Sequence, residues 1–208
     1  MNTSEPAVAA LFDEYGDPAP GPFSPHIELL PTVNSFNAVQ NFANAQFTLN
    51  SVVLTPHSRG SVTLNESDPL ASPMVDYNFY AEPLDLEIMR QSVRTALDFI
   101  STPEWQEFLT APVSPLLAAV IKDSRNDTEM DAYIRASTSI SFHPVGTCGM
   151  SAVDSNWGVV DPDFTVKGLK GLRVIDASIM PFIPAAHTQA AVYVIAERAA
   201  DIIKSTAS

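Results

Sequence analysis

Hydrophobic and polar positions alternate clearly only after a first stretch of about fifty residues that is rich in Pro, Gly, Asn, Ser and Ala. Within that stretch, only residues 26–30 have a strand pattern. The alternating segments 47–54 and 61–65 are separated by a Gly-containing turn, so we expect them to pair as an antiparallel hairpin. Residues 74–80 are predicted to form a third strand.

Helical spacing follows. Apolar residues recur at helical intervals through residues 82–100, with acidic residues early and arginines later. A second helix is predicted over 102–109, with Thr102 as N-cap, and a third over 126–137. We expect the first helix to pack on the antiparallel strands, which gives the fold class α+β.

The last third of the chain has a different pattern. Residues 172–178 (LRVIDAS) are apolar, β-branched and end in small polar side chains, which predicts a buried strand whose C-terminal end faces a ligand. Residues 188–205 predict a long helix that starts near Thr188 and ends near Lys204. Small residues at its start would allow close approach of another group to the backbone.

Charge narrows the classes of partner. The net charge is −13 and only eleven of 208 residues are Lys or Arg, which argues against binding of nucleic acid or an anionic membrane surface. No apolar run reaches the ~18 residues that span a bilayer, and the first residues show no signal-peptide pattern.

Cysteine usage and sequons add two further indications. The single cysteine, Cys148, excludes an internal disulfide and a cysteine-built zinc site, and we expect it to be a small buried filler. Asn-X-Ser/Thr sequons begin at Asn2, Asn65 and Asn126; together they favour secretion weakly.

Two of the four histidines lie among small residues, His143 in SFHPVGTCGM and His187 in PAAHTQAA. The proline after His143 favours extended backbone there. A helix N-terminus at Thr188 would favour a neutral His187 ring, which can accept a proton. The alternative for each is a core histidine bonded to backbone groups. A metal site of both histidines with a carboxylate such as Asp176 is also compatible with the sequence.

Other catalytic motifs are absent from the sequence. There is no G-x-S-x-G, no G-x-x-x-x-G-K-[ST], no H-E-x-x-H and no G-x-G-x-x-G. A dinucleotide-binding glycine loop is therefore not present in this chain.

Several long strings resemble the glucose-methanol-choline (GMC) family of FAD-dependent oxidoreductases: HPVGTCGM, GVVDPDFTVKGLKGLRVIDASIMP and IPAAHTQAAVYVIAERAADII. LTPHSRGSVTLNESDPLASPMVDYNFY resembles the hairpin of that family's substrate domain. GPFSPHIELL, the aromatic residue before His143 and a second histidine in AAHTQ are similar to fungal aryl-alcohol oxidases.

This resemblance implies a C-terminal portion of a longer enzyme, without the N-terminal half that holds the ADP part of FAD. Residues 1–150 would then be a partial substrate-binding domain with an antiparallel sheet and flanking helices. Residues 151–208 would be the segment that returns to the FAD-binding domain. We expect the isolated chain to be inactive and not to retain FAD, since the glycine loop is missing.

The resemblance also implies the site residues. His143 would take the alcohol proton as a hydride passes from the substrate carbon to flavin N5, and His187 would hydrogen-bond the same oxygen. Both rings would be neutral and buried among Phe142, Pro144 and Pro184. The resemblance implies no metal ligand. Phe142 would line the substrate pocket. Four residues would contact the cofactor, chiefly through backbone N–H groups: Asp176, Ala177, Thr188 and Gln189.

The implied reaction is oxidation of aryl or unsaturated primary alcohols to aldehydes, with O2 reduced to hydrogen peroxide by a secreted enzyme. The resemblance leaves three alternatives open. One is a dehydrogenase that passes electrons to quinones, the second is a lyase that splits cyanohydrins, and the third is an inactive fragment or binding module.

Overall fold

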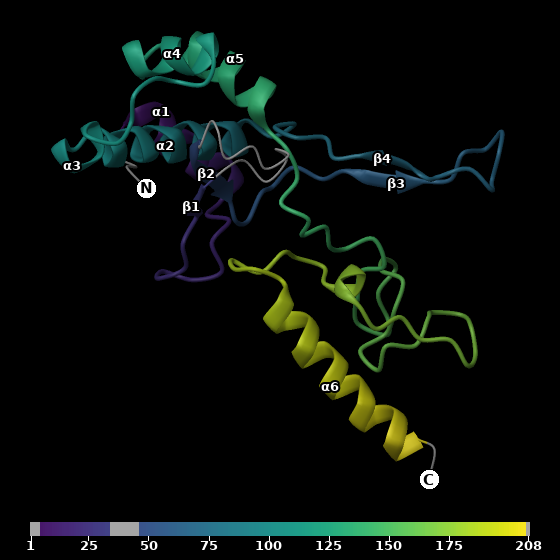
Figure 1. The fold of residues 1–208 in the computed structure, drawn as a ribbon. Coiled ribbons are helices and arrows are strands. Elements are labelled where there is room, and N and C mark those ends of the chain that lie inside the picture. The colour runs from purple at the N-terminus through teal and green to yellow at the C-terminus, as the bar shows by residue number, and fades with distance from the viewer. Residues whose placement is uncertain (1–4, 34–45, 207–208) are drawn as a thin grey trace. The chain divides into compact units, whose positions relative to one another are not determined.

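The computed structural model describes residues 5–33 and 46–206, and the chain divides into two compact units. The first comprises Met1–Ser58 and Phe79–Ile140; the second comprises Arg59–Asn78 and Ser141–Ser208. Figure 1 shows their helices and strands. Both units are therefore built from two separate stretches of sequence, and each is described by itself.

The first unit combines an antiparallel strand pair with helices. Strand β1 pairs with β2 so that Ile27 lies opposite Val53 and Val33 opposite Phe47. Helix α2 packs against both strands, α1 packs on α2, and α5 contacts α2 and α4. The elements of this unit are α1 (Pro6–Tyr15), β1 (Ile27–Val33), β2 (Phe47–Val53), α2 (Pro83–Ile100), α3 (Pro103–Gln106), α4 (Pro115–Lys122) and α5 (Asp127–Ser137).

Helix α2 is the central element of this unit. Pro83 occupies its first turn, where a missing N–H costs nothing, and Leu84 and Ile88 are fully buried one turn apart. Other residues of α2 form a core with α4 and α5, made of Leu86, Val93, Val120, Met130 and Ile134. The amphipathic pattern read from residues 82–100 thus decides which face of α2 is covered.

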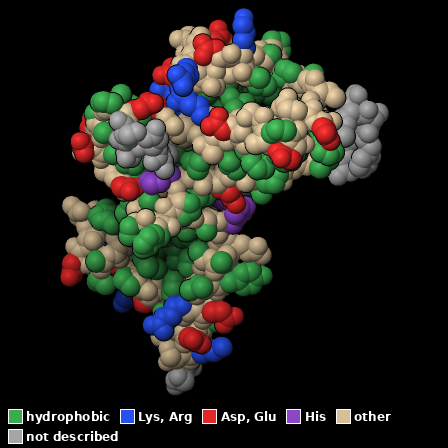
Figure 2. Space-filling model, turned by 90° about the vertical axis from the view of Figure 1, so that its left-hand side faces the viewer, with side chains coloured by type: hydrophobic (Ala, Val, Ile, Leu, Met, Phe, Trp, Pro, Cys, Tyr) green, Lys and Arg blue, Asp and Glu red, His purple; other side chains and the backbone are tan. Residues whose placement is uncertain are grey.

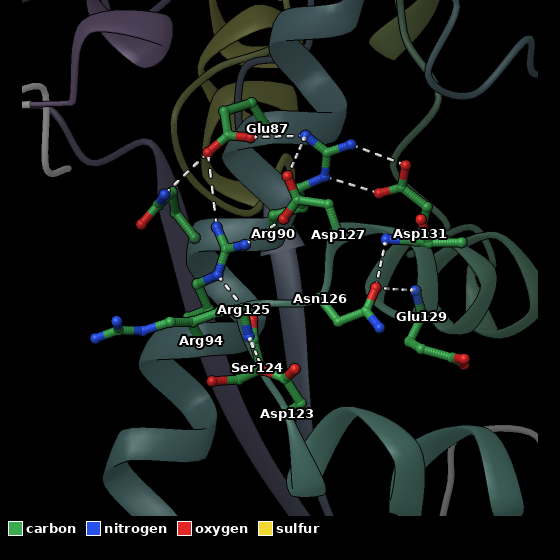
Figure 3. Close-up of polar contacts among 12 residues, drawn as sticks. Glu87, Arg90, Arg94, Asp123, Ser124, Arg125, Asn126, Asp127, Glu129 and Asp131 are labelled. Carbon is green, nitrogen blue, oxygen red and sulfur yellow. Dashed lines mark hydrogen bonds and ion pairs between the residues drawn. The ribbon is translucent and has the colours of Figure 1, made fainter.

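Charged side chains join α2 to α5 beside this core (Figure 3). The Arg90 guanidinium donates two parallel hydrogen bonds to Asp131, at 2.7 and 2.8 Å, and a third to Glu87 at 2.9 Å. The bonds to Asp131 raise the pKa of Arg90 above its ordinary value. Arg94 donates to Asp127 at 2.6 Å. The paired geometry fixes the rotation of α5 about α2, because a bidentate contact permits one relative orientation.

Asp85, in the first turn of α2, is a buried carboxylate with 2% of its surface exposed. Its two oxygens accept hydrogen bonds from the backbone N–H groups of His57 and Ser58, both at 2.7 Å. The Ser58 hydroxyl in turn accepts from the N–H of Glu82 at 3.1 Å. This cluster fixes the segment that follows β2 to the start of α2, at the point where the chain leaves the first unit.

The second unit has little regular structure. Strand β3 (Ser61–Thr63) pairs antiparallel with β4 (Met74–Asp76). Its helices are the 3-10 turn η2 (Ala177–Ile179) and α6 (Gln189–Thr206). Its core is formed by Val160, Phe164, Ile179 and Ala199, with Ile195 and Ile202 of α6 packed against them. The spacing of Ile195, Ala199 and Ile202 places one stripe of α6 on this core.

The α+β class and the three helices predicted near 82–100, 102–109 and 126–137 are confirmed, the second as the shorter α3, and so is the long C-terminal helix. The predicted hairpin of residues 47–54 with 61–65 is wrong, because β2 pairs with β1, and β3 pairs with β4. The connection after β2 does not close a turn, since Asp85 binds its N–H groups. Helices α1 and α4 were not predicted.

The predicted strand over residues 172–178 is also wrong. Only an isolated bridge between Thr165 and Arg173 forms in this region. Asp176 then accepts a hydrogen bond from the N–H of Ser178 at 2.8 Å, which starts η2. A short acidic side chain that bonds to the backbone two residues ahead offers an alternative to strand pairing, so the extended segment ends there.

Within residues 5–33 and 46–206, no helix is long and apolar enough to cross a bilayer.

Replacing Asp85 with Ala should lower the free energy of unfolding by about 3 kcal/mol, because two backbone N–H groups lose a charged acceptor in a buried place. Asp98→Ala, at an exposed position of the same helix, is the matched control and should change it by less than about 0.5 kcal/mol. Urea unfolding monitored by circular dichroism measures both. Equal, small effects of the two substitutions would show that the Asp85 cluster does not stabilise the fold.

Candidate active site

The segment that carries His143 is bonded to the segment around η2. The N–H of Cys148 donates to the carbonyl of Ser178 at 2.9 Å, and the N–H of Met150 donates to the carbonyl of Ile179 at 2.8 Å. Both segments lie in the second unit. These two bonds place residues about thirty positions apart in the sequence side by side.

Gly146 allows the two segments to approach closely. Its φ of +88° lies in the left-handed region, and a Cβ at this position would lie 3.3 Å from the carbonyl oxygen of Met180. Only glycine adopts this backbone conformation without strain. The chain then runs from Met180 through a short connection to His187, so the approach at Gly146 brings the start of α6 toward His143.

The His143 and His187 rings lie together as expected. Their centroids are 4.9 Å apart and the ring planes meet at 76°. The predicted proximity of the two rings is therefore confirmed, although 43 residues separate them in the chain. Rings this close to each other can both contact one small group of a ligand.

Phe142, directly before His143, has φ +59° and a side chain that is 70% exposed. A bulky residue in the left-handed region is an outlier that the surrounding structure must hold in place. Phe142 directly precedes His143 in the sequence. Its aromatic ring is at the surface, where a ligand can contact it. No sequence pattern indicates a positive φ at a phenylalanine, so this feature could be found only in the structure.

The expected burial of the histidines is not found. His143 is half-buried, His187 is exposed, and Pro144 is exposed as well. Cys148 is half-buried rather than fully buried.

Asp176 and Ala177 lie at the start of η2. The Asp176 carboxylate is exposed and accepts hydrogen bonds from the N–H and the hydroxyl of Ser178, so it orders this turn. Ser178 is a residue that sequence analysis missed: its hydroxyl holds Asp176 and its carbonyl holds Cys148. In the sequence, only the run of small residues Asp176-Ala177-Ser178 pointed to Ser178.

Thr188 and Gln189 lie at the start of α6. Thr188 is buried, with 9% of its surface exposed, and its carbonyl accepts from the N–H of Val192 at 3.0 Å, which begins the helix. Gln189 is exposed, and the next two residues are alanines. The first N–H groups of an α-helix have no acceptor within the helix. They are therefore available to a polar group of a ligand, and the small side chains do not obstruct it.

The alternative of a metal site lacks a complete ligand set within residues 5–33 and 46–206, where no group of three or more His, Cys, Asp or Glu side chains could hold an ion.

Apolar side chains cover much of one face of the second unit, and charged side chains gather toward the C-terminal end of α6 (Figure 2). Large exposed apolar residues of this unit include Trp157, Phe182, Tyr193 and Val194. The Trp157 side chain is 53% exposed.

Comparison with known proteins identifies the class. Residues 56–196 match the family model described as GMC oxidoreductase, and the chain belongs to this oxidoreductase family. A dehydrogenase (eriK) of Hericium erinaceus is 41% identical over 99% of the chain and 34% of its own length. Pyranose dehydrogenase 3 of Leucoagaricus meleagris is 40% identical over 90% of the chain and 32% of its own length. The chain thus spans about a third of these relatives.

Solved structures agree with this assignment. Formate oxidase of Aspergillus oryzae has a TM-score of 0.82 at 28% identity, over 98% of this chain and 36% of that one. A fungal aryl-alcohol oxidase has a TM-score of 0.64 at 36% identity, over 94% of this chain and 29% of that one. The expected GMC resemblance is therefore confirmed.

FAD is the cofactor of this family. The residues present fit such a group. The N-terminus of α6 provides backbone N–H donors beside small side chains, and the histidine pair lies in the same unit. These donors suit the carbonyl oxygens and ring nitrogens of an isoalloxazine, which are hydrogen-bond acceptors.

In the complete, FAD-loaded enzyme, Gly146→Ala should lower the thermal stability more than Gly168→Ala does. It should also lower the FAD content. Both glycines have positive φ, so each substitution introduces left-handed strain of about 1–2 kcal/mol. Only at Gly146 does the added methyl group also meet a carbonyl oxygen, whereas at Gly168 no atom lies within 4 Å. Thermal unfolding and the ratio of FAD to protein absorbance test this expectation. Equal losses in both variants would contradict a role for the close approach.

Proposed function

We propose that this chain forms part of a longer FAD-dependent enzyme that oxidises primary alcohols, aryl or unsaturated, to aldehydes. The observation that carries the proposal is the pair of imidazole rings at 4.9 Å. Membership of the GMC family and similarity to an aryl-alcohol oxidase support it. The substrate is a small-molecule alcohol, and the electron acceptor is O2, which is reduced to hydrogen peroxide.

In this proposal His143 is the general base. A neutral imidazole nitrogen accepts the hydroxyl proton of the substrate, and this assistance is worth about 10²–10⁴-fold in rate. The half-buried position of His143 limits competition from water for the same nitrogen. When bound, FAD accepts the hydride from the substrate carbon.

His187 orients the alcohol. Its ring stands at 76° to that of His143, so an N–H of one ring and the accepting nitrogen of the other can point to one oxygen from different directions. Two hydrogen bonds to the same oxygen fix the substrate carbon relative to the base. This positioning converts a loose encounter into a defined geometry for the transfer.

Phe142 provides the preference for aryl or unsaturated alcohols. Its exposed ring lies next in sequence to the base, and aromatic rings pair favourably in stacked or edge-to-face arrangements. Asp176, Ala177, Thr188 and Gln189 hold the cofactor in this proposal, the last two through the N-terminus of α6.

The proposal includes the division of the chain between two domains of the longer enzyme, with residues 1–150 in a substrate-binding domain and 151–208 in the FAD-binding domain. It also includes an extracellular location, in keeping with the three sequons.

A quinone-dependent dehydrogenase is the second candidate. The two relatives reported above, at 41% and 40% identity, both carry the name dehydrogenase, and one of them is a pyranose dehydrogenase. The histidine pair serves either enzyme, because proton removal from a hydroxyl group does not depend on how the reduced cofactor is reoxidised.

In the complete enzyme, His143→Ala should slow flavin reduction by alcohol about 10²-fold or more, with little change in alcohol binding. His187→Ala should have a smaller effect, since the base remains. His26→Ala is the control, because His26 lies in the first unit and pairs with Asp17. Stopped-flow reduction of folded, FAD-loaded protein measures all three rates. Near-normal reduction in the His143 variant would overturn the mechanism.

Reoxidation of the alcohol-reduced enzyme separates the two candidates. An oxidase should form one hydrogen peroxide per aldehyde in air, and added benzoquinone should not be required for turnover. The measurement is aldehyde absorbance together with a peroxidase-coupled assay. Turnover that requires quinone and yields no peroxide would favour the dehydrogenase and refute the oxidase.

A further inference from the structure

The loop that joins β3 to β4 contains a sequon in a defined turn. The side-chain oxygen of Asn65 accepts hydrogen bonds from the N–H of Ser67 at 3.1 Å and from the Ser67 hydroxyl at 2.7 Å. The N–H of Asp68 donates to the backbone carbonyl of Asn65 at 3.2 Å, which closes the turn. The hydroxyl that defines the sequon is thus bonded to the acceptor asparagine itself.

The side-chain nitrogen of Asn65 is left available by this arrangement. No acceptor for it occurs among the residues that the structure describes. Residues 66–73 of the loop are exposed, and Leu70 at its tip is 97% exposed. A large polar group attached to Asn65 would extend from a surface loop, the usual place of such modifications.

The sequon at Asn126 differs in its structure. Its side-chain oxygen caps helix α5 by accepting from the N–H groups of Thr128 at 3.1 Å and Glu129 at 3.3 Å (Figure 3). The following residue, Asp127, is paired with Arg94. At Asn126 these bonds cap a helix and the neighbouring Asp127 carries an ion pair, whereas at Asn65 the similar bonds order only a turn in an exposed loop. Asn2, the third candidate, lies outside the described residues.

We propose that Asn65 is an N-glycosylation site. In this reaction the side-chain nitrogen bonds to the anomeric carbon of a lipid-linked oligosaccharide diphosphate. The bond from that carbon to the diphosphate breaks, the lipid diphosphate leaves, and the nitrogen loses one proton. The proposal rests on the extracellular location within the proposed function, because the lipid-linked donor is met only in the secretory pathway.

A glycan at this position has a physical consequence for the loop. Leu64 is 67% exposed and Leu70 is 97% exposed, so the loop presents two large apolar side chains. Exposed apolar groups promote association, and a bulky hydrophilic chain on Asn65 shields them. We therefore expect the unglycosylated protein to self-associate more readily.

The test uses the full-length enzyme, secreted from yeast with a supplied leader so that it passes through the secretory pathway whatever its natural location. Glycopeptide mass spectrometry before and after peptide-N-glycosidase treatment should show the Asn65 peptide modified in most molecules. The Asn2 and Asn126 peptides are scored separately in the same digest. An unmodified Asn65 peptide in the secreted protein would overturn the proposal.

Three substitutions separate a glycan site from a turn former. Asn65→Asp keeps an oxygen acceptor for Ser67 and should abolish the modification without unfolding the loop. Ser67→Ala should abolish it too, and Ser67→Thr should preserve it. Size-exclusion chromatography should show more self-association for the Asn65→Asp variant, while flavin reduction by alcohol stays unchanged. If the wild-type enzyme shows no flavin reduction by alcohol, the proposed catalysis is wrong. The test of the glycan at Asn65 does not depend on that result.

Discussion

The candidate site depends on the backbone contact between the segment after His143 and the segment around η2. Two hydrogen bonds, from Cys148 to Ser178 and from Met150 to Ile179, hold these segments together. Gly146 permits the approach because a side chain there would meet a carbonyl oxygen. Since neither segment is a regular strand, the contact is made of few bonds. Each of these groups therefore has a large influence on where the two histidine rings lie.

The second unit has its own core, which holds this contact in register. Val160, Phe164, Ile179 and Ala199 are almost fully buried, and Ile179 belongs both to the core and to the contact with Met150. Packing of α6 on the core therefore acts on the same segment that orders the site. The histidine pair is positioned by backbone and core, while Phe142, His187 and Gln189 remain exposed.

The first unit is stabilised by a different means. A buried carboxylate, Asp85, binds two N–H groups of the connection after β2, and the bidentate pair of Arg90 with Asp131 orients α5. Charge-assisted hydrogen bonds of this kind are geometrically demanding, so they specify one arrangement of loop and helices. The sequence showed only acidic residues early in a helix, and nothing in the pattern indicated that one of them would be buried.

The sequence by itself determined the helices with a strong amphipathic period, the α+β class and, through long matching strings, the GMC family with its candidate pair His143 and His187. These are local or string-like signals. Tertiary structure alone decided that β2 pairs with β1, that residues 172–178 do not form a strand, and that Phe142 takes a positive φ. Strand partners and irregular backbone depend on hydrogen bonds between residues far apart in the chain, and a single sequence carries no local mark of those bonds.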